Sequence, residues 1–380
     1  MSGQPAARPP SETWAVVAGG GTAGHVLPGL AVARALVDAG HPPDTIQWVG
    51  SETGIEGRLV PEAGFGVTLL PGRGIERRLS AASVAATINL ARAVVRAMGV
   101  VSRLRPAVVL ALGGYASVPC ALAAVGRRVP VVVCEQNAVP GAANRLVARF
   151  AKAAAVSFPG TALPRATVTG NPVRAEVLAV DRGRDRESAR RALALPLDRR
   201  VLAVFGGSLG ARRINFALLS ALERWAGRDD LAVRHVVGRR DWKMVQDAVP
   251  PLPDAGVAYE AVEYEDRMDL LLAAADVAVC RAGATTVAEL AVVGLPAVLV
   301  PLPGAPGDHQ TANARHLADA GAAVLVPDAE LDGARLAGEV EALLASPDRL
   351  AAMSEAAAAV ARRDAAQQVA ALLERHARRG

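Results

Sequence analysis

The stretch Trp14-Ala-Val-Val-Ala-Gly-Gly-Gly-Thr-Ala-Gly24 decides the fold predicted for this chain. Its apolar first half predicts a buried strand, its glycines predict a sharp turn, and a helical pattern follows. The stretch Val201-Leu-Ala-Val-Phe-Gly-Gly-Ser-Leu-Gly-Ala211 repeats the same order of strand, glycine turn and helix. Two such strand–turn–helix units in one chain predict two doubly wound α/β domains, each built on a parallel sheet.

Short runs of Val, Ala and Leu recur outward from both stretches, and several end in glycine before a helical pattern. Near-continuous apolar strands that alternate with helices are typical of parallel sheets covered on both faces. We therefore expect an N-terminal domain at 12–172, a C-terminal domain at 173–345, and a helical segment at 346–380 that packs back on the first domain. The further predicted strands lie at 46–49, 108–112, 129–134, 166–169, 233–237, 277–280 and 297–300.

The composition is that of a globular protein with reduced thiols. Hydrophobic residues make up 52% of the 380 residues, which is enough for the cores of two domains. The three cysteines are odd in number and lie in or beside apolar runs, which indicates buried thiols and no disulfide framework. The N-terminal apolar run is too short for a signal peptide, so we expect no export. The uncharged run 107–126 is long enough to span a bilayer, but Gly113, Gly114 and Pro119 interrupt it, which favours a buried strand.

Positive charge is concentrated in the first half of the chain. Residues 1–170 hold 16 Lys/Arg and 8 Asp/Glu, whereas the whole chain has a net charge of +5. The segment 77–105 has arginines but no acidic residue, and a helical pattern places Arg92, Arg96 and Arg103 on one side with apolar residues. Such a segment suits an anionic bilayer surface, although an ordinary Arg-decorated surface helix has the same pattern. Aromatic residues do not interleave with the arginines, so nucleic acid is disfavoured as a partner.

The first glycine turn, residues 19–24, predicts a site for phosphate or diphosphate. Glycine lets backbone amides approach an anion, and the following helix adds its positive end. The turn also matches the dinucleotide fingerprint, so an NAD-binding oxidoreductase stays open as an alternative. No acidic residue ends the second predicted strand cleanly, which disfavours that alternative. His25 directly follows the turn and is a candidate catalytic residue, with a purely structural histidine as the other interpretation.

Two loops in the second half predict a site for a phosphorylated ligand with a ribose. The turn 206–211 offers backbone amides and the Ser208 hydroxyl to a phosphate. After the strand at 277–280, small residues bring the backbone near a ligand, and the Glu289 carboxylate can accept two hydrogen bonds from a ribose diol. A carboxylate that merely complements the helix dipole is the alternative for Glu289.

Polar residues at other strand ends suit a substrate rich in hydroxyl groups. A turn residue that satisfies its own backbone is the alternative interpretation for each of them. No cluster of His, Cys, Asp and Glu has metal-ligand spacing, so we expect no metal. The polar candidates are Tyr115, Glu135, Gln136, Asn137, Asn171, Arg174, Asp308, Gln310 and Asn313.

Taken together, these motifs resemble one family. The chain contains, in this order, GGGTAGHVLPGLAVA, GGYASVP, CEQNAVPGAANR, VTGNPVR, FGGSLGARRIN, VCRAGATTVAEL, GLPAVLVPLP and DHQTANA. The set is similar to the MurG family, the UDP-GlcNAc transferases that convert lipid I to lipid II in peptidoglycan synthesis. The resemblance covers about residues 14–327. It implies the GT-B fold, in which two Rossmann-like domains face a cleft, with the donor on the C-terminal domain and the acceptor on the N-terminal domain.

The resemblance also implies the site residues. We expect His25 to be the catalytic base, with Glu135 as second choice, and we place the acceptor at Gly21, Tyr115 and Gln136. The family pattern is broken at Leu209, His309 and Glu265, where the family commonly has Gln, Gln and Ile. The residues implied to bind UDP-GlcNAc are Thr22, Ala23, Gly24, Asn137, Arg174, Ser208, Ala284, Thr286, Glu289, Gln310 and Asn313.

The reaction implied is a glycosyl transfer in cell-wall biogenesis, and hence in cell shape and cell division. GlcNAc moves from UDP-GlcNAc to the C4 hydroxyl of MurNAc in undecaprenyl-diphospho-MurNAc-pentapeptide, with inversion at the anomeric carbon. We expect Ser208, the loop amides and Arg174 to hold the negative charge that develops on UDP, without a cofactor. The enzyme is expected at the cytoplasmic face of the cell membrane as a peripheral protein. Another GT-B glycosyltransferase and a UDP-GlcNAc epimerase are the alternatives.

Overall fold

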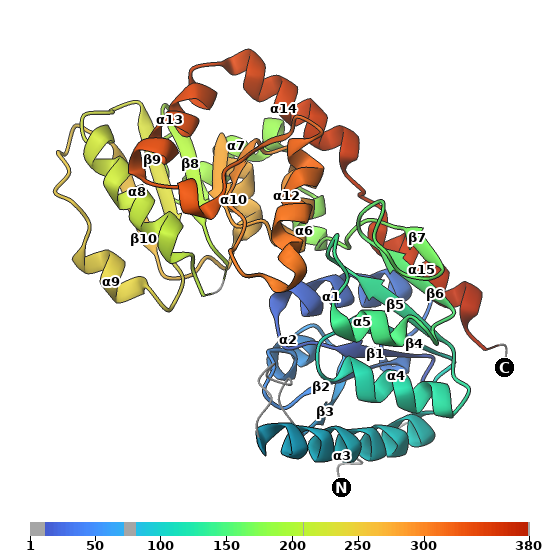
Figure 1. Ribbon diagram of the computed structural model, residues 1–380. Coiled ribbons are helices and arrows are strands. Elements are labelled where there is room, and N and C mark those ends of the chain that lie inside the picture. Colours follow the sequence, from blue (N-terminus) through green and yellow to red (C-terminus); the bar gives the residue numbers. More distant parts are fainter. Residues whose placement is uncertain (1–11, 72–80, 208, 379–380) are drawn as a thin grey trace, which may run out of the picture. The chain divides into compact units, whose positions relative to one another are not determined.

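The computed structural model describes residues 12–71, 81–207 and 209–378, and only the backbone of residues 81–91. The chain divides into two compact units. Unit 1 comprises Met1–Arg174 together with Asp364–Gly380, and unit 2 comprises Ala175–Arg363. Each unit holds one parallel sheet covered by helices (Figure 1), which confirms the predicted α/β class with two Rossmann-like domains.

The sheet of unit 1 has seven parallel strands in the order β3-β2-β1-β4-β5-β6-β7. Alternate residues of β1 face opposite sides, so Ala15 and Val17 join one core while Val16 and Ala18 join the other. Burial on both faces explains why such strands are continuous apolar runs in the sequence. The strands are β1 (Ala15–Gly19), β2 (Ile46–Ser51), β3 (Gly66–Leu70), β4 (Val108–Gly113), β5 (Val131–Glu135), β6 (Ala153–Val156) and β7 (Ala166–Val168).

Helices cover both faces of this sheet. The helices α1 (Ala23–Asp38) and α15 (Ala365–His376) cover one face, with α2 (Glu56–Glu62) beside β2 and β3. The other face is covered by α3 (Ala81–Leu104), α4 (Ser117–Gly126) and α5 (Ala142–Val147). Figure 1 shows α15 in red against the blue and green elements of unit 1. The preceding helix α14 (Pro347–Val360) instead packs on helices of unit 2, so the chain after residue 346 contributes one helix to each unit.

The sheet of unit 2 has six parallel strands in the order β10-β9-β8-β11-β12-β13. Its main core forms where Leu218, Leu222 and Trp225 of α8 pack with Val340 and Leu343 of α13. The strands are β8 (Arg200–Phe205), β9 (Leu231–Val236), β10 (Ala258–Val262), β11 (Val277–Cys280), β12 (Ala297–Leu299) and β13 (Ala323–Leu325). The helices are α6 (Ala175–Leu178), α7 (Arg182–Ala192), α8 (Arg212–Trp225), α9 (Trp242–Asp247), α10 (Met268–Ala274), α11 (Ala284–Val293), α12 (His309–Ala318), α13 (Gly333–Leu344) and α14.

Strand order reverses at one place in each sheet. In unit 1 the reversal lies between β1 and β4, and in unit 2 it lies between β8 and β11. Ligands of doubly wound sheets bind beyond the carboxyl ends of the strands at such switch points. The turns 19–24 and 206–211 follow β1 and β8, so each glycine turn stands at the switch point of its own sheet.

The uncharged run 107–126 forms β4, which is the predicted buried strand, followed by a glycine turn and the helix α4. Within the part of the chain that the structure describes, every helix is too short or too polar to cross a bilayer.

Candidate active site

A buried carboxylate closes the first glycine turn. Glu56, the first residue of α2, is fully buried. Its Oε2 accepts a hydrogen bond from the Gly21 amide at 2.8 Å, and its Oε1 accepts one from the Ser51 amide at 2.6 Å. Any side chain at Gly20 or Gly54 would collide with this carboxylate, because a Cβ there would lie 2.4 Å or 2.0 Å from its atoms. The Gly21 amide is therefore committed to Glu56.

His25 lies in the first turn of α1, beside the end of β4. Its Nδ1 is 3.3 Å from Thr22 Oγ1, which is within hydrogen-bond distance. Gly113 ends β4 with a φ of +95°, and a Cβ there would lie 3.3 Å from both His25 Nε2 and Asn144 Nδ2. Glycine at this position therefore lets the imidazole and the Asn144 amide approach the strand end. The first glycine turn and the GGYASVP motif, predicted separately, meet at this point.

Glu135, at the end of β5, holds the loop that follows it. The carboxylate is 2% exposed. Its Oε1 accepts hydrogen bonds from the amide and the side chain of Asn137 at 3.0 and 3.3 Å. Its Oε2 accepts bonds from the Gly141 amide and from Asn144 Nδ2, both at 2.9 Å. Four accepted hydrogen bonds make Glu135 the organiser of residues 136–141 and fix the Asn137 side chain.

Several buried polar atoms near the carboxyl ends of the unit 1 strands lack a hydrogen-bond partner among the described residues. Leaving such an atom unpaired costs about 1–3 kcal/mol. Hydroxyl groups of a ligand, or water, are partners that remove this cost. The atoms are the Tyr115 hydroxyl, Ser117 Oγ, Gln136 Oε1, Asn144 Oδ1 and both polar side-chain atoms of Asn171. Ser117 and Asn144 were not predicted as site residues, although both lie within the motifs quoted above.

The second glycine turn is closed by its own backbone. The Gly210 amide donates to the Gly207 carbonyl at 2.9 Å. Gly210 has a φ of +79°, and a Cβ there would lie 2.1 Å from the Val237 carbonyl oxygen, so only glycine fits. The predicted phosphate ligand Ser208 falls outside the described residues.

Two arginines beside the second turn share one buried carboxylate. Asp241 is fully buried, and it accepts hydrogen bonds from Arg240 Nη2 at 2.8 Å and Arg212 Nη2 at 2.9 Å. The hydrogen bond from Arg240 and then that from Arg212 hold the pKa of Asp241 below its usual value, so the carboxylate stays ionised. The two guanidinium side chains are 47% and 55% exposed, and the trio carries a net positive charge beside the turn.

Arg281, the first residue after β11, ties three loops of unit 2 together. Its Nη1 donates to the carbonyl oxygens of Val300 and Pro301 at 3.1 and 3.0 Å. The same nitrogen pairs with Asp328 Oδ1 at 2.6 Å. This clamp positions the loops after β11 and β12 next to each other. The sequence placed Arg281 in a motif but gave it no role.

The helix α11 presents three predicted donor-binding residues. Its N-cap, Gly283, is extended, and Ala284 and Thr286 form its first turn. Glu289 follows one turn later and is 7% exposed.

The helix α12 packs against α11 and contributes two further predicted residues. Asn313 is fully buried, and its Nδ2 donates to the Ala282 carbonyl at 3.2 Å. The Gln310 Oε1 accepts a hydrogen bond from the Leu302 amide at 3.0 Å, which orients the side-chain amide. Predicted residues from two separate motifs are thus brought together at one end of the unit 2 sheet.

Glu265, which departs from the family pattern, accepts hydrogen bonds from other residues of unit 2. It is 7% exposed, and its Oε2 accepts a hydrogen bond from Arg234 Nη2 at 2.8 Å. Its Oε1 accepts a bond from the Arg267 amide at 3.1 Å. The unusual acidic residue therefore has its partners within the protein.

The predicted site residues divide between the two units. Gly21 to His25, Tyr115, Glu135 to Asn137 and the half-buried Arg174 belong to unit 1. Those on α11 and α12 belong to unit 2. Within the described ranges no three His, Cys, Asp or Glu side chains form a group that would hold a metal ion. The cysteines are buried thiols, and burial raises the pKa of Cys120 and Cys134 to about 12.

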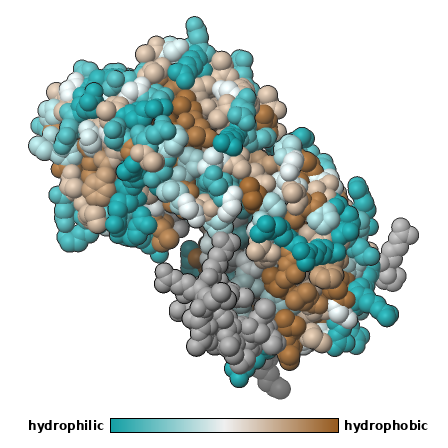
Figure 2. All heavy atoms as spheres, in the orientation of Figure 1, coloured by the Kyte–Doolittle hydropathy of each residue, from teal (hydrophilic) through white to brown (hydrophobic). Residues whose placement is uncertain are grey.

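The outer face of α3 combines arginines with apolar side chains. Arg92, Arg96 and Arg103 are exposed, as are Val95 (68%) and Met98 (41%). Ala93, Ala97 and Val101 are buried instead. Figure 2 shows apolar surface gathered on unit 1. Arg77 and Arg78 and the side chains of Ile88 and Leu90 lie outside the described part.

Comparison with known proteins gives matches over nearly the whole chain. Residues 15–156 match the glycosyltransferase family 28 N-terminal domain, and residues 201–369 match the family 28 C-terminal domain. A UDP-N-acetylglucosamine–N-acetylmuramyl-(pentapeptide) pyrophosphoryl-undecaprenol N-acetylglucosamine transferase of Nocardioides sp. is 45% identical over 355 residues, which cover 93% of this chain and 96% of the relative.

Solved structures agree with these matches. The crystal structure of Acinetobacter baumannii MurG superposes with a TM-score of 0.76 at 30% identity and covers 96% of this chain and 99% of that one. The UDP-GlcNAc 2-epimerase from Neisseria meningitidis, solved bound to UDP-GlcNAc, has a TM-score of 0.67 at 14% identity, with coverage of 95% and 100%. At that identity the epimerase shares the fold alone.

Proposed function

The chain belongs to glycosyltransferase family 28, and from this premise we infer that it transfers GlcNAc from UDP-GlcNAc to undecaprenyl-diphospho-MurNAc-pentapeptide, forming lipid II. The observation that carries this function is the 45% identity, over 93% of the chain, to a transferase named for that reaction. The acceptor group is the C4 hydroxyl of MurNAc, and the anomeric centre inverts in a single displacement.

The donor binds at the carboxyl ends of the unit 2 strands. Glu289 accepts hydrogen bonds from the ribose hydroxyls, and Gln310 orients the GlcNAc ring. The support for this is that α11 and α12 are packed together and that the Leu302 amide already orients Gln310. The diphosphate lies at the turn 206–211, where the helix α8 begins and where Arg212 and Arg240 leave a net positive charge.

The acceptor sugar binds at the carboxyl ends of β4 and β5 in unit 1. The unpaired polar atoms of Tyr115, Gln136 and Asn144 support this, because a sugar supplies hydroxyl groups to pair with them. His25 removes the proton from the attacking hydroxyl, and its Nε2 lies beside the glycine that ends β4. Glu135 is the weaker candidate base, since protonation would disturb the four hydrogen bonds that hold its loop.

Negative charge develops on the UDP leaving group as the bond to the sugar breaks. We assign the stabilisation of this charge to Ser208, the amides of its turn and Arg174, and we also assign Thr22, Ala23, Gly24 and Asn137 to donor binding. Fixed donors cost no reorganisation when the charge develops, which is why such groups lower a barrier efficiently.

The decisive experiment is incubation of the full chain with radiolabelled UDP-GlcNAc and a lipid I analogue. The expected result is label in the lipid product and release of one UDP for each sugar transferred. An incubation with UDP-GlcNAc alone separates the alternatives, because an epimerase converts the donor without an acceptor. Donor conversion in that control, with no labelled lipid in the complete mixture, would overturn the proposed transfer.

The enzyme acts as a peripheral protein at the cytoplasmic face of the membrane, through the segment 77–105. The exposed Arg92, Val95, Arg96 and Met98 support this, because arginines near an anionic surface each contribute about 1 kcal/mol and apolar side chains enter the interface. Sedimentation with vesicles containing anionic phosphatidylglycerol tests the idea. Replacement of Arg92 and Arg96 by Gln should weaken binding to these vesicles but not to neutral vesicles, and an unchanged profile would exclude this segment.

A further inference from the structure

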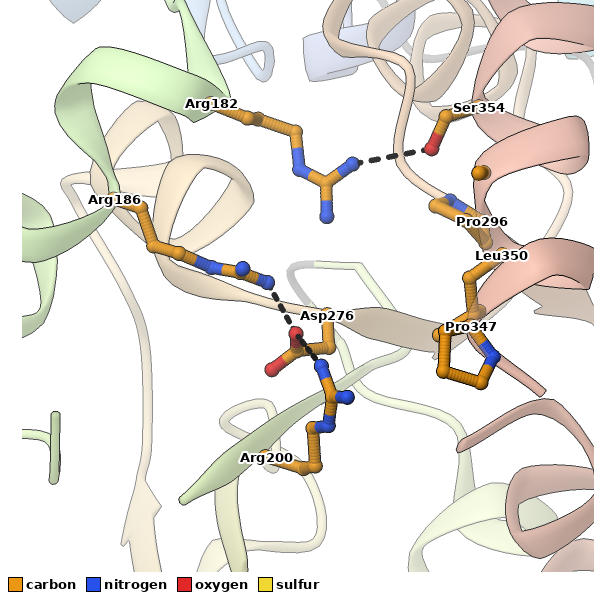
Figure 3. Close-up of a pocket in the computed structure, with 9 residues that line it drawn as sticks. Arg182, Arg186, Arg200, Asp276, Pro296, Pro347, Leu350 and Ser354 are labelled. Carbon is orange, nitrogen blue, oxygen red and sulfur yellow. Dashed lines mark hydrogen bonds and ion pairs between the residues drawn. The ribbon is translucent and has the colours of Figure 1, made fainter. Parts of the chain in front are cut away.

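A pocket of about 160 Å³ lies in unit 2, away from the loops assigned to the donor (Figure 3). Arg200 begins β8, Asp276 precedes β11, and Pro296 precedes β12, and all three line the pocket. The pocket therefore lies at the amino ends of these strands, whereas the donor loops follow their carboxyl ends. The remaining lining comes from α7 and α14.

Positive charge outweighs negative charge in this pocket. Asp276 is 3% exposed and is its one acidic lining residue. The carboxylate pairs with Arg186, with Arg190 at 2.8 Å and with Arg200 at 3.3 Å. Arg182 also lines the pocket. The three lining guanidinium groups against one carboxylate leave a net charge of +2, and the buried Arg190, which does not line the pocket, adds a further positive charge behind it.

The acidic residues of α7 and its N-cap do not reduce this excess. Asp181 caps the helix, where its side chain accepts hydrogen bonds from the Gly183 and Arg184 amides. Asp185 pairs with the Arg184 side chain at 2.7 Å. Glu187 pairs with Arg191 one turn further on. Each of these carboxylates is engaged with a group outside the pocket lining.

Donor groups of the arginines remain unused in the pocket. The Nε atoms of Arg182 and Arg186 are buried and have no partner among the described residues. Figure 3 shows Arg186 and Arg200 converging on Asp276, while Arg182 points toward the Ser354 hydroxyl. Arg182 Nη1 and Nη2 donate to the carbonyl oxygens of Gly294 and Ala275 at 2.7 and 2.8 Å, and burial, then the charge of Arg186, lower the pKa of Arg182 to about 10. A bound anion would supply the missing negative charge.

We propose that this pocket binds inorganic phosphate or diphosphate. A forked guanidinium group suits a tetrahedral oxyanion, and several of them converge here. The α14 helix begins at Pro347 on the rim and adds its positive end. The volume is below the roughly 300–1,000 Å³ of sites for drug-sized ligands, so a complete nucleotide sugar is excluded. The proposal does not depend on the function assigned to the donor loops.

Calorimetric titration of the full chain with inorganic diphosphate tests this site. The wild type should show two saturable classes, one at the donor turn and one at this pocket, and UDP should displace the first class only. The double variant Arg186→Gln/Arg200→Gln should lose at least tenfold in affinity for the second class while the first class is unchanged. Arg184→Gln is the matched control, because it removes an arginine from the same helix that does not line the pocket.

Further variants keep the result interpretable. Arg200→Lys keeps the charge and should bind diphosphate with an affinity within a few-fold of the wild type. Arg200→Gln alone should still fold, because the Arg200 side chain is 42% exposed. Thermal unfolding of each variant without ligand checks this. Diphosphate binding that the double variant leaves unchanged, equal losses in Arg184→Gln and the double variant, or displacement of all bound diphosphate by UDP would each overturn the proposal.

Discussion

The two glycine turns share a sequence pattern but differ in what holds them. In unit 1 the Gly21 amide donates to the buried carboxylate of Glu56, which places a negative charge against the turn. In unit 2 Gly210 donates to Gly207 within the turn, and the paired arginines beside it leave a net positive charge. We therefore expect the diphosphate to be held mainly at the second turn. We expect the first turn to act mainly in placing His25.

The largest effect is expected at His25. His25→Ala should lower kcat by about 10²–10⁴-fold, the usual contribution of a general base, while KM for UDP-GlcNAc changes little. Steady-state kinetics with a lipid I analogue would measure both. His376→Ala, in α15, is the control and should retain activity. Equal losses in turnover and in UDP-GlcNAc binding would instead mean that His25 binds UDP-GlcNAc. The proposed difference in function between the two turns would then be wrong.

The next effect is expected on the donor side. Glu289→Gln should raise KM for UDP-GlcNAc by about 10–100-fold with a smaller change in kcat, because a charged hydrogen-bond acceptor for the ribose is lost. Calorimetric titration with UDP would report the same loss without turnover. Glu355→Gln, on the exposed surface of α14, is the matched control. UDP affinity that stays at the wild-type value would leave Glu289 with a purely structural role.

Glu56→Gln tests the first turn directly. Glutamine keeps the size but offers one acceptor and one donor, so one of the two amides of Gly21 and Ser51 faces a donor. The free energy of unfolding should fall by about 1–3 kcal/mol, and kcat should fall severalfold as His25 loses its fixed position. Chemical denaturation measures the free energy of unfolding and steady-state kinetics measures kcat. Glu52→Gln, at an exposed position, is the control. An unchanged kcat in Glu56→Gln, despite a loss of stability, would contradict us, since it would mean that Glu56 does not help to place His25.

The smallest effect is expected at the buried His235 of β9, and it concerns the free energy of unfolding. His235 contacts Asn215 Oδ1 at 3.0 Å and the Tyr259 hydroxyl at 2.9 Å, and burial lowers its pKa to about 3 from 6.5. Between these values the unfolded chain binds a proton that the folded chain does not, so stability falls as pH drops from 6.5 toward 3. The free energy of unfolding at pH 5.5 should therefore be about 1 kcal/mol lower than at pH 7.5. Chemical denaturation at pH 7.5 and 5.5 measures the free energy of unfolding at each pH. The difference between the two values should be smaller for His235→Gln than for the wild type, and an unchanged difference would exclude His235 as its source.

Most of the strands were predictable, because a strand buried on both faces must be apolar at every position. The strands β3, β6, β10 and β13 were not predicted, and β3 and β10 have exposed positions that break the apolar pattern. The motif residues at strand ends were predictable for a related reason, since parallel strands deliver their carboxyl ends to one edge. Glu56 was not predictable, because a glutamate that opens a helix is ordinary and the Gly21 amide it holds is 35 positions away. The same holds for the pocket arginines, because Arg186 and Asp276 are separated by 90 positions.

The α/β class, the two glycine turns and the family could be inferred from the amino-acid order, because these depend on local apolar runs and on motifs that are continuous in the chain. The packed structure was needed to learn which carboxylates bind the protein's own amides and which arginines share one partner. Those pairings depend on side chains from distant segments that meet in a low-dielectric interior. There each charge must find a partner, and only the packed fold decides which partner is within reach.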